Sequence, residues 1–206
     1  MTTTDQTPLH GSHFYANWAK ERIDEIDATL TSLEGRVSEV QSDIHAKVNR
    51  ILADLREKRD AFRDTIKKEA ESDEAAWMHA KARLEKDWIA FEAEVQKYVE
   101  TLGKQAEQNQ AIFQARSAAQ LKSWHDLTEK LVGDAKDFAA ERGHEIDATV
   151  KHMKADAAAA QEKFEKLSRA GSESWSALNA ALAETRHAFD QANKAAHDAF
   201  KRARSS

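Results

Sequence analysis

Histidine is the residue in this chain best suited to bind a metal ion, since imidazole is the commonest metal ligand in proteins. Nine histidines are present. His10 and His13 are three positions apart, but they lie in or beside a polar N-terminal segment. His144 and His152 share one face of a predicted helix, where two turns separate them by about 12 Å, too far for one ion. We expect these histidines to lie in solvent or at helix boundaries.

Carboxylates offer no stronger candidate for catalysis or metal binding. Glu184 and His187 form a Glu-x-x-His pair, the unit that metal-binding bundles carry on facing helices. Other acidic residues, such as Glu57 and Glu69, stand beside lysine or arginine, as on a solvated helix face. The sequence contains no glycine-rich phosphate loop and no strained nucleophile turn. We therefore expect no catalytic, cofactor-binding or metal-binding residue, and no enzyme.

The charge balance and the cysteine count limit the possible partners and compartments. The chain carries 31 basic and 36 acidic residues, a net charge of −5, and no cysteine. A non-specific nucleic-acid binder needs a basic face that displaces counterions, so we expect no nucleic-acid partner. The absence of cysteine fits a reducing cytoplasm, where we expect the protein to be. No run of about 18 apolar residues is present that could cross a membrane.

Helix-forming residues dominate the chain, and the single proline, Pro8, comes before the first periodic segment. We expect residues 1–12 to form a flexible arm. A heptad-like apolar spacing then predicts one long helix from about Phe14 to Glu71, with a stutter near Ile44. A shorter helix is expected from about Asp73 to Leu102.

The second half has the same organisation. A helix is predicted from about Ala111 to Ala170, with a register shift near Gly143, and a last helix runs to about Ala203. Gly171 suits a left-handed helix end, and Ser172 suits the next N-cap.

Two further breaks are less distinct. Ser72 is a plausible N-cap and Gly103 a plausible helix end. The sequence leaves open whether these two positions are turns or kinks.

The two halves look related by a shift of 98 residues, which is fourteen heptads. The shift places Trp77 on Trp175, and it matches further apolar pairs: Leu84 with Leu182, Phe91 with Phe189, Leu55 with Met153, and Ile66 with Phe164. We expect two units, 13–103 and 104–206, each with a long and a short helix; the alternative is that they form one continuous domain. The predicted fold is all-α, an elongated antiparallel helical bundle or a coiled coil of long amphipathic helices.

Five tryptophans, Trp18, Trp77, Trp88, Trp124 and Trp175, fall mostly on the apolar stripes. They are typical of a bundle core. The alternative is a surface that meets lipid, since interfacial helices carry tryptophan, phenylalanine and leucine on their apolar faces.

The segments Ser72–Tyr98 and Ser172–Phe200 resemble a family of small bacterial coiled-coil proteins associated with stress responses. In both segments a serine break precedes a tryptophan, and apolar residues follow at helical spacing; Arg186 stands where the second tryptophan, Trp88, stands in the first segment. The likeness covers about 60 of the 206 residues. It implies a bacterial cytoplasmic protein without known catalytic residues.

These patterns favour a non-enzymatic helical scaffold or interaction protein, and the resemblance implies that it is associated with stress. Its expected partner is a protein, or a second copy of the chain, that packs on the apolar stripes. The alternative is an amphipathic-helix protein that coats lipid or storage-granule surfaces reversibly.

Overall fold

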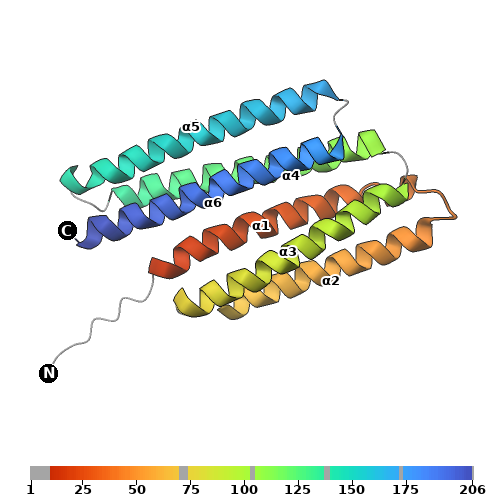
Figure 1. The fold of residues 1–206 in the computed structure, drawn as a ribbon, viewed down its shortest axis with the longest axis horizontal. Helices are drawn as coiled ribbons and strands as arrows, with labels where there is room; N and C mark the ends of the chain where they lie inside the picture. Colours follow the sequence, from red (N-terminus) through yellow and green to blue (C-terminus); the bar gives the residue numbers. More distant parts are fainter. Residues whose placement is uncertain (1–9, 70–73, 103–104, 137–139, 172–173, 206) are drawn as a thin grey trace.

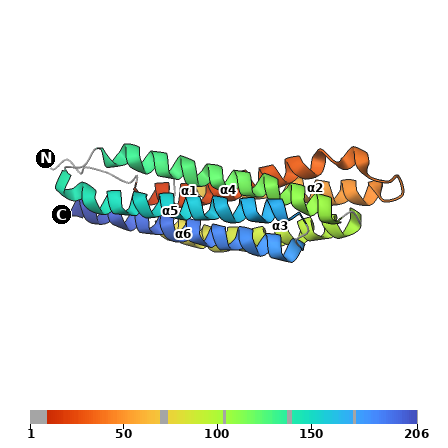
Figure 2. The same cartoon turned by 90° about the horizontal axis from the view of Figure 1, so that it is seen from above.

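The computed structural model describes residues 10–69, 74–102, 105–136, 140–171 and 174–205. The described chain forms six α-helices and one short 3-10 helix, and it contains no strand. The helices are α1 (His10–Glu34), η1 (Val37–Glu39), α2 (His45–Glu69), α3 (Glu74–Leu102), α4 (Gln105–Ala135), α5 (Ala140–Ala170) and α6 (Trp175–Ser205). The predicted all-α, elongated antiparallel bundle is confirmed (Figures 1 and 2).

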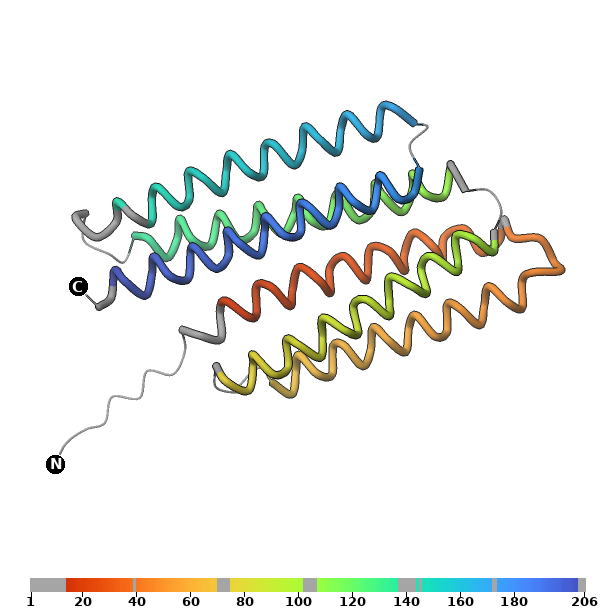
Figure 3. Tube along the Cα trace, in the orientation of Figure 1, coloured from red at the N-terminus to blue at the C-terminus, as the bar shows by residue number. Residues whose placement is uncertain are grey.

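The helices are arranged as two three-helix units, α1–α3 and α4–α6. Successive helices run in opposite directions, so that α1 and α4, which begin the two units, are antiparallel neighbours (Figure 1). The units meet through α1, which packs on α4 and α6, and through α3, which packs on α4. Helices α2 and α5 lie on the outer sides and pack mainly within their own units (Figure 3).

The single helix predicted from Phe14 to Glu71 is wrong. The chain turns back between α1 and α2, through η1. The apolar spacing continues through this turn because Val37 and Val40, although outside the α-helices, still pack on the apolar core. A heptad pattern that persists through a turn cannot be distinguished by spacing alone from a stutter within one helix.

The helix predicted from Ala111 to Ala170 is also two helices, α4 and α5. The register shift near Gly143, interpreted as a stutter, lies just after a reversal of chain direction. Each unit therefore contains three helices of similar length, not a long and a short one. The expected arm of residues 1–12 also overlaps the first helix, because α1 begins at His10.

Gly171 has a φ of +64°, so the predicted left-handed end of α5 is confirmed. The next helix is capped by Ser174, whose Oγ accepts a hydrogen bond from the Ala177 N–H at 3.3 Å. Ser72, Gly103 and Ser172, the other predicted boundary residues, lie outside the described part of the chain.

Each unit has its own apolar core. One buried cluster belongs almost entirely to α1, α2 and α3, and two others belong to α4, α5 and α6. The predicted tryptophan core is confirmed, since Trp18, Trp77 and Trp124 are 1% exposed and Trp88 is 7% exposed. Trp175 is half-buried and packs on the core of the first unit, although it belongs to the second.

The 98-residue shift relates equivalent helices. Leu84 of α3 and Leu182 of α6 are both fully buried, and Leu55 of α2 and Met153 of α5 are likewise core residues. None of the described helices is long and apolar enough to span a bilayer.

Candidate functional site: a buried ionic junction and a surface groove

Charged side chains are buried where α1, α3, α4 and α6 meet, at the interface between the two units. They occupy helix positions that the apolar stripes would otherwise fill. The members of this ionic junction are Glu21, Arg22 and Glu25 from α1, Trp88 and Glu92 from α3, Arg116 and Gln120 from α4, and Arg186 and Asp190 from α6. No other described region buries as many charged groups in contact.

Glu25 is the centre of the junction, and its side chain is completely buried. One carboxylate oxygen accepts a hydrogen bond from Arg116 Nε at 2.7 Å. The other accepts from Gln120 Nε2 and from Arg186 Nε, both at 3.0 Å. Glu25 of the first unit thus binds two helices of the second unit, which fixes the register between the units.

The two guanidinium groups that bind Glu25 also bind a second carboxylate and an aromatic ring. Arg116 forms two hydrogen bonds with Glu92, and Arg186 lies 3.6 Å from the same carboxylate. The Arg186 guanidinium carbon is 4.6 Å from the centre of the Trp88 ring, and that of Arg116 is 5.5 Å away. The indole face is electron-rich and attracts both cations.

Arg22 continues the junction toward α6. It donates to Asp190 at 2.8 Å, pairs with Glu21, and lies 5.3 Å from the ring centre of Trp18. Beyond it the interface remains polar, because the Asn193 side chain donates to the Phe14 carbonyl at 2.9 Å.

The two buried glutamates of α1 have pKa values shifted in opposite directions. Burial raises the pKa of Glu21 to about 7 from an ordinary 4.5, and Arg22 offsets only part of that effect. Burial would also raise the pKa of Glu25, but the charges of Arg186 and Arg116 hold it below its ordinary value. Glu25 is therefore a permanent anion of the junction, whereas Glu21 titrates near neutral pH.

A buried group with a pKa near neutrality could transfer protons in an active site. Glu21, however, is only 1% exposed and lies between Arg22 and other junction residues. Because Glu21 is buried, a substrate at the surface cannot contact its carboxyl group. We therefore expect the titration of Glu21 to change the free energy of unfolding.

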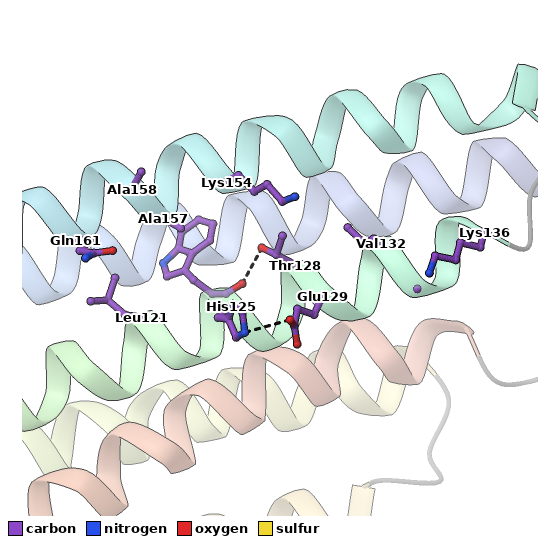
Figure 4. Close-up of a pocket in the computed structure, with 12 residues that line it drawn as sticks. Leu121, His125, Thr128, Glu129, Val132, Lys136, Lys154, Ala157, Ala158 and Gln161 are labelled. Carbon is purple, nitrogen blue, oxygen red and sulfur yellow. Dashed lines mark hydrogen bonds and ion pairs between the residues drawn. The ribbon is translucent and has the colours of Figure 1, made fainter.

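A second feature is a groove of about 720 Å³ on the surface of the second unit (Figure 4). It runs between α4, from Leu121 to Lys136, and α5, from Lys154 to Gln161. Its volume is within the range of sites that hold small molecules.

The histidines that we examined in the sequence are not brought together. His144 and His152 are exposed, and His187 contacts Gln191 at 2.8 Å. Glu184 forms an ion pair with Lys163 of α5. Among the described residues, no group of three potential ligands could hold a metal ion.

Three residues of the candidate metal-binding pairs have side chains outside the described part of the chain. The side chains of His10 and His13 are not described, although both residues belong to α1. A second Glu-x-x-His pair, Glu141 and His144, was missed in the sequence, and the side chain of Glu141 is also not described.

The ionic junction was not predicted from the sequence. Its signal is present as polar residues within the apolar stripes: Arg116 and Gln120 lie between Phe113 and Trp124 at helical spacing. Arg186, noted as the replacement for a tryptophan, lies on the equivalent tryptophan, Trp88.

Comparisons with protein-family models, with curated proteins and with solved structures found no match to this chain.

Replacing Glu21 by glutamine should reduce the pH dependence of stability. Between pH 4.5 and 7 the folded protein retains a proton on Glu21 that the unfolded chain has released. The stabilising effect of this proton is complete below pH 4.5 and is lost as the pH rises through 7, by up to about 3 kcal/mol. Urea unfolding at pH 5 and pH 8 measures the difference, and parallel pH profiles for Glu21→Gln and the natural protein would contradict it.

Replacing Glu25 by glutamine should lower the free energy of unfolding by about 3 kcal/mol at pH 7. The change leaves Arg116 and Arg186 buried with Glu92 as the remaining shared carboxylate. Glu165→Gln is the matched control, because Glu165 pairs with Arg169 on the surface and its loss should cost less than about 0.5 kcal/mol. Equal effects of the two substitutions in urea unfolding would contradict a structural role for the junction.

Proposed function

We propose that this protein is a non-enzymatic helical scaffold or interaction protein. The ionic junction supports this proposal, because its charged groups are used to join two three-helix units. The Glu25 carboxylate oxygens accept hydrogen bonds from Arg116, Gln120 and Arg186. Such buried pairs contribute little net stability relative to apolar packing, but they specify how elements dock. A fixed relation between two helical units is what a scaffold needs.

The observation that carries the proposal is a pair of large, exposed apolar side chains on one face of α3. Met78 is 62% exposed and Ile89 is 67% exposed, and they are eleven positions apart, which corresponds to about three helical turns. They share a face with the exposed Ala82 and with Glu85, whose side chain is 51% exposed and pairs with Lys81, and the buried Leu84 lies on the other side of the helix. Large exposed apolar residues grouped on one helix face favour a protein contact.

A photoreactive amino acid at position 89 tests this proposal in living cells. We expect it to cross-link to one discrete protein, or to a second copy of the chain, because a partner covers Ile89. The control is the same amino acid at Lys166, whose side chain is 70% exposed on α5. A lack of protein adducts at position 89, or the same adducts at both positions, would count against the proposal.

The cellular setting belongs to the proposal as well. The lack of cysteine throughout the sequence favours a reducing compartment, and we propose the bacterial cytoplasm. The association with stress rests on the resemblance of Ser72–Tyr98 and Ser172–Phe200 to coiled-coil stress proteins.

The alternative is that the protein coats lipid or storage-granule surfaces. One observation favours it: the apolar cores lie almost entirely within the two units, and a buried ionic junction lies between the units, so their separation would expose only a small part of each core. Against it, Trp18, Trp77 and Trp124 are already buried in the bundle.

Flotation with neutral and anionic liposomes separates the two functions. For a scaffold we expect the protein to stay at the bottom of the gradient with unchanged tryptophan emission, because its apolar stripes are buried against one another. Flotation together with altered emission would show that the helices open onto lipid, and would favour the coating function.

A further inference from the structure

Buried polar residues lie on the helices that join the two units. Helices α1, α4 and α6, in the middle of the molecule, carry every buried polar or charged residue of the described chain (Figure 1). The buried residues of α2, α3 and α5 are aliphatic or aromatic. Because water can hydrate a polar surface, opening this interface costs less free energy than exposing an apolar core. The molecule can therefore open here while each three-helix unit stays folded.

Acids outnumber bases in the ionic junction at this interface. Its three guanidinium groups belong to Arg22, Arg116 and Arg186, and its four carboxyl groups to Glu21, Glu25, Glu92 and Asp190. Arg116 and Arg186 both bind Glu25 and Glu92, which leaves Arg22 to bind the other two acids. If every group were ionised, the junction would hold one uncompensated negative charge away from water.

Arg22 is divided between one acid on α1 and one on α6. It donates to Asp190 Oδ2 at 2.8 Å and pairs with Glu21 Oε2. The other oxygen of each acid, Oδ1 of Asp190 and Oε1 of Glu21, is buried without a donor among the described residues. Burial accordingly raises the pKa of Asp190 and of Glu21. A proton on one of these acids removes the excess charge.

Other charged groups on the helices around α1 form pairs of their own. These pairs are Lys81 with Glu85 on α3, Lys20 of α1 with Asp126 of α4, and Arg63 of α2 with Asp27 of α1. Lys81 attracts Asp190, but Glu85 shares its charge. The charge balance of the junction therefore depends on whether Glu21 and Asp190 together hold a proton.

We propose that pH controls the separation of the two three-helix units. The interface is closed while one of the two acids bound by Arg22 holds a proton, and it opens more readily when that proton is lost. Opening exposes the polar faces of α1, α4 and α6, and within the apolar cores it breaks the contacts of Ile112 and Trp175 with the first unit. This inference is independent of the proposed scaffold function, because it concerns an internal interface and not the exposed face of α3.

The open form should be favoured at high pH. In the closed interface the pKa of Glu21 is about 7, and in the open interface water returns it toward 4.5. Below pH 4.5 the acid is protonated in both forms, and above pH 7 it is ionised in both. From pH 5 to pH 8 the ratio of open to closed molecules should therefore increase by up to about 70-fold.

Labelling of an introduced cysteine measures the opening, because the natural chain contains no thiol. Ser123 of α4 is 4% exposed and lines a small cavity with Asn17 and Lys20 of α1, so Ser123→Cys places a thiol in the interface. Ala181→Cys places one in the core of the second unit, where Ala181 is 3% exposed. The reagent is dithiodipyridine, and each rate is divided by that of the same variant unfolded in urea at the same pH, which removes the effect of thiol ionisation.

At pH 8 we expect Ser123→Cys to be labelled at least about tenfold faster than Ala181→Cys, because the units separate without unfolding. The normalised rate at Ser123→Cys should rise by up to about 70-fold from pH 5 to pH 8. Adding Glu21→Gln should remove this rise. The matched control, Asp126→Asn, should keep it, because a hydrogen bond from Lys122 holds the pKa of this interface acid below its ordinary value.

Three labelling results would overturn the proposal. These are equal rates for the two thiols at pH 8, equal rates at Ser123→Cys at pH 5 and pH 8, and an unchanged pH dependence with Glu21→Gln. The first would show that the thiols react only after the whole chain unfolds. Circular dichroism at both pH values checks that each variant remains helical, and loss of the helical signal of the natural protein at pH 8 would also overturn the proposal.

Discussion

A carboxylate removed from water must be compensated by charge and hydrogen bonds, and the complete burial of Glu25 imposes this requirement on the whole molecule. The compensation comes from Arg116 and Gln120 of α4 and from Arg186 of α6. These groups reach Glu25 when α1, α4 and α6 are in one particular register. The apolar cores stabilise each unit, but the position of one unit on the other depends on this carboxylate.

Apolar contacts form the cores of the units and ionic contacts join the units, and this arrangement determines which helix faces remain exposed. Because the cores lie almost entirely within the units, with Ile112 of α4 and Trp175 of α6 as the residues that join the first core from the second unit, the outer helices α2 and α5 serve mainly to complete the cores. In the first unit, ion pairs also join α2 to α1. The large apolar side chains that are exposed in this unit, Met78 and Ile89, belong to α3. In the second unit α5 packs through alanine against α4, and the surface that remains is a channel. The two units each contain three helices of similar length, but their exposed surfaces differ.

The sequence predicts the helical class and most core residues, because both follow from apolar spacing. It does not predict the number of helices, since Val37 and Val40 keep that spacing through a turn. The left-handed end at Gly171 was predictable because a glycine followed by serine marks it locally. The ionic junction was not predicted, because Glu25, Arg116 and Arg186 are far apart in sequence and resemble solvated residues until the fold joins them. The groove was not predicted either, because it depends on how the side chains of α4 and α5 pack together, and local sequence spacing does not give this.

Trp88 and Arg186 occupy equivalent positions of the two units, and they contact each other across the interface. Two copies of the first unit docked in this way would place tryptophan against tryptophan, and two copies of the second would place guanidinium against guanidinium, with repulsion. The cation–π contact forms when the units differ. At this pair of positions the interface is therefore heterotypic, because the first unit supplies the indole ring and the second unit supplies the guanidinium group.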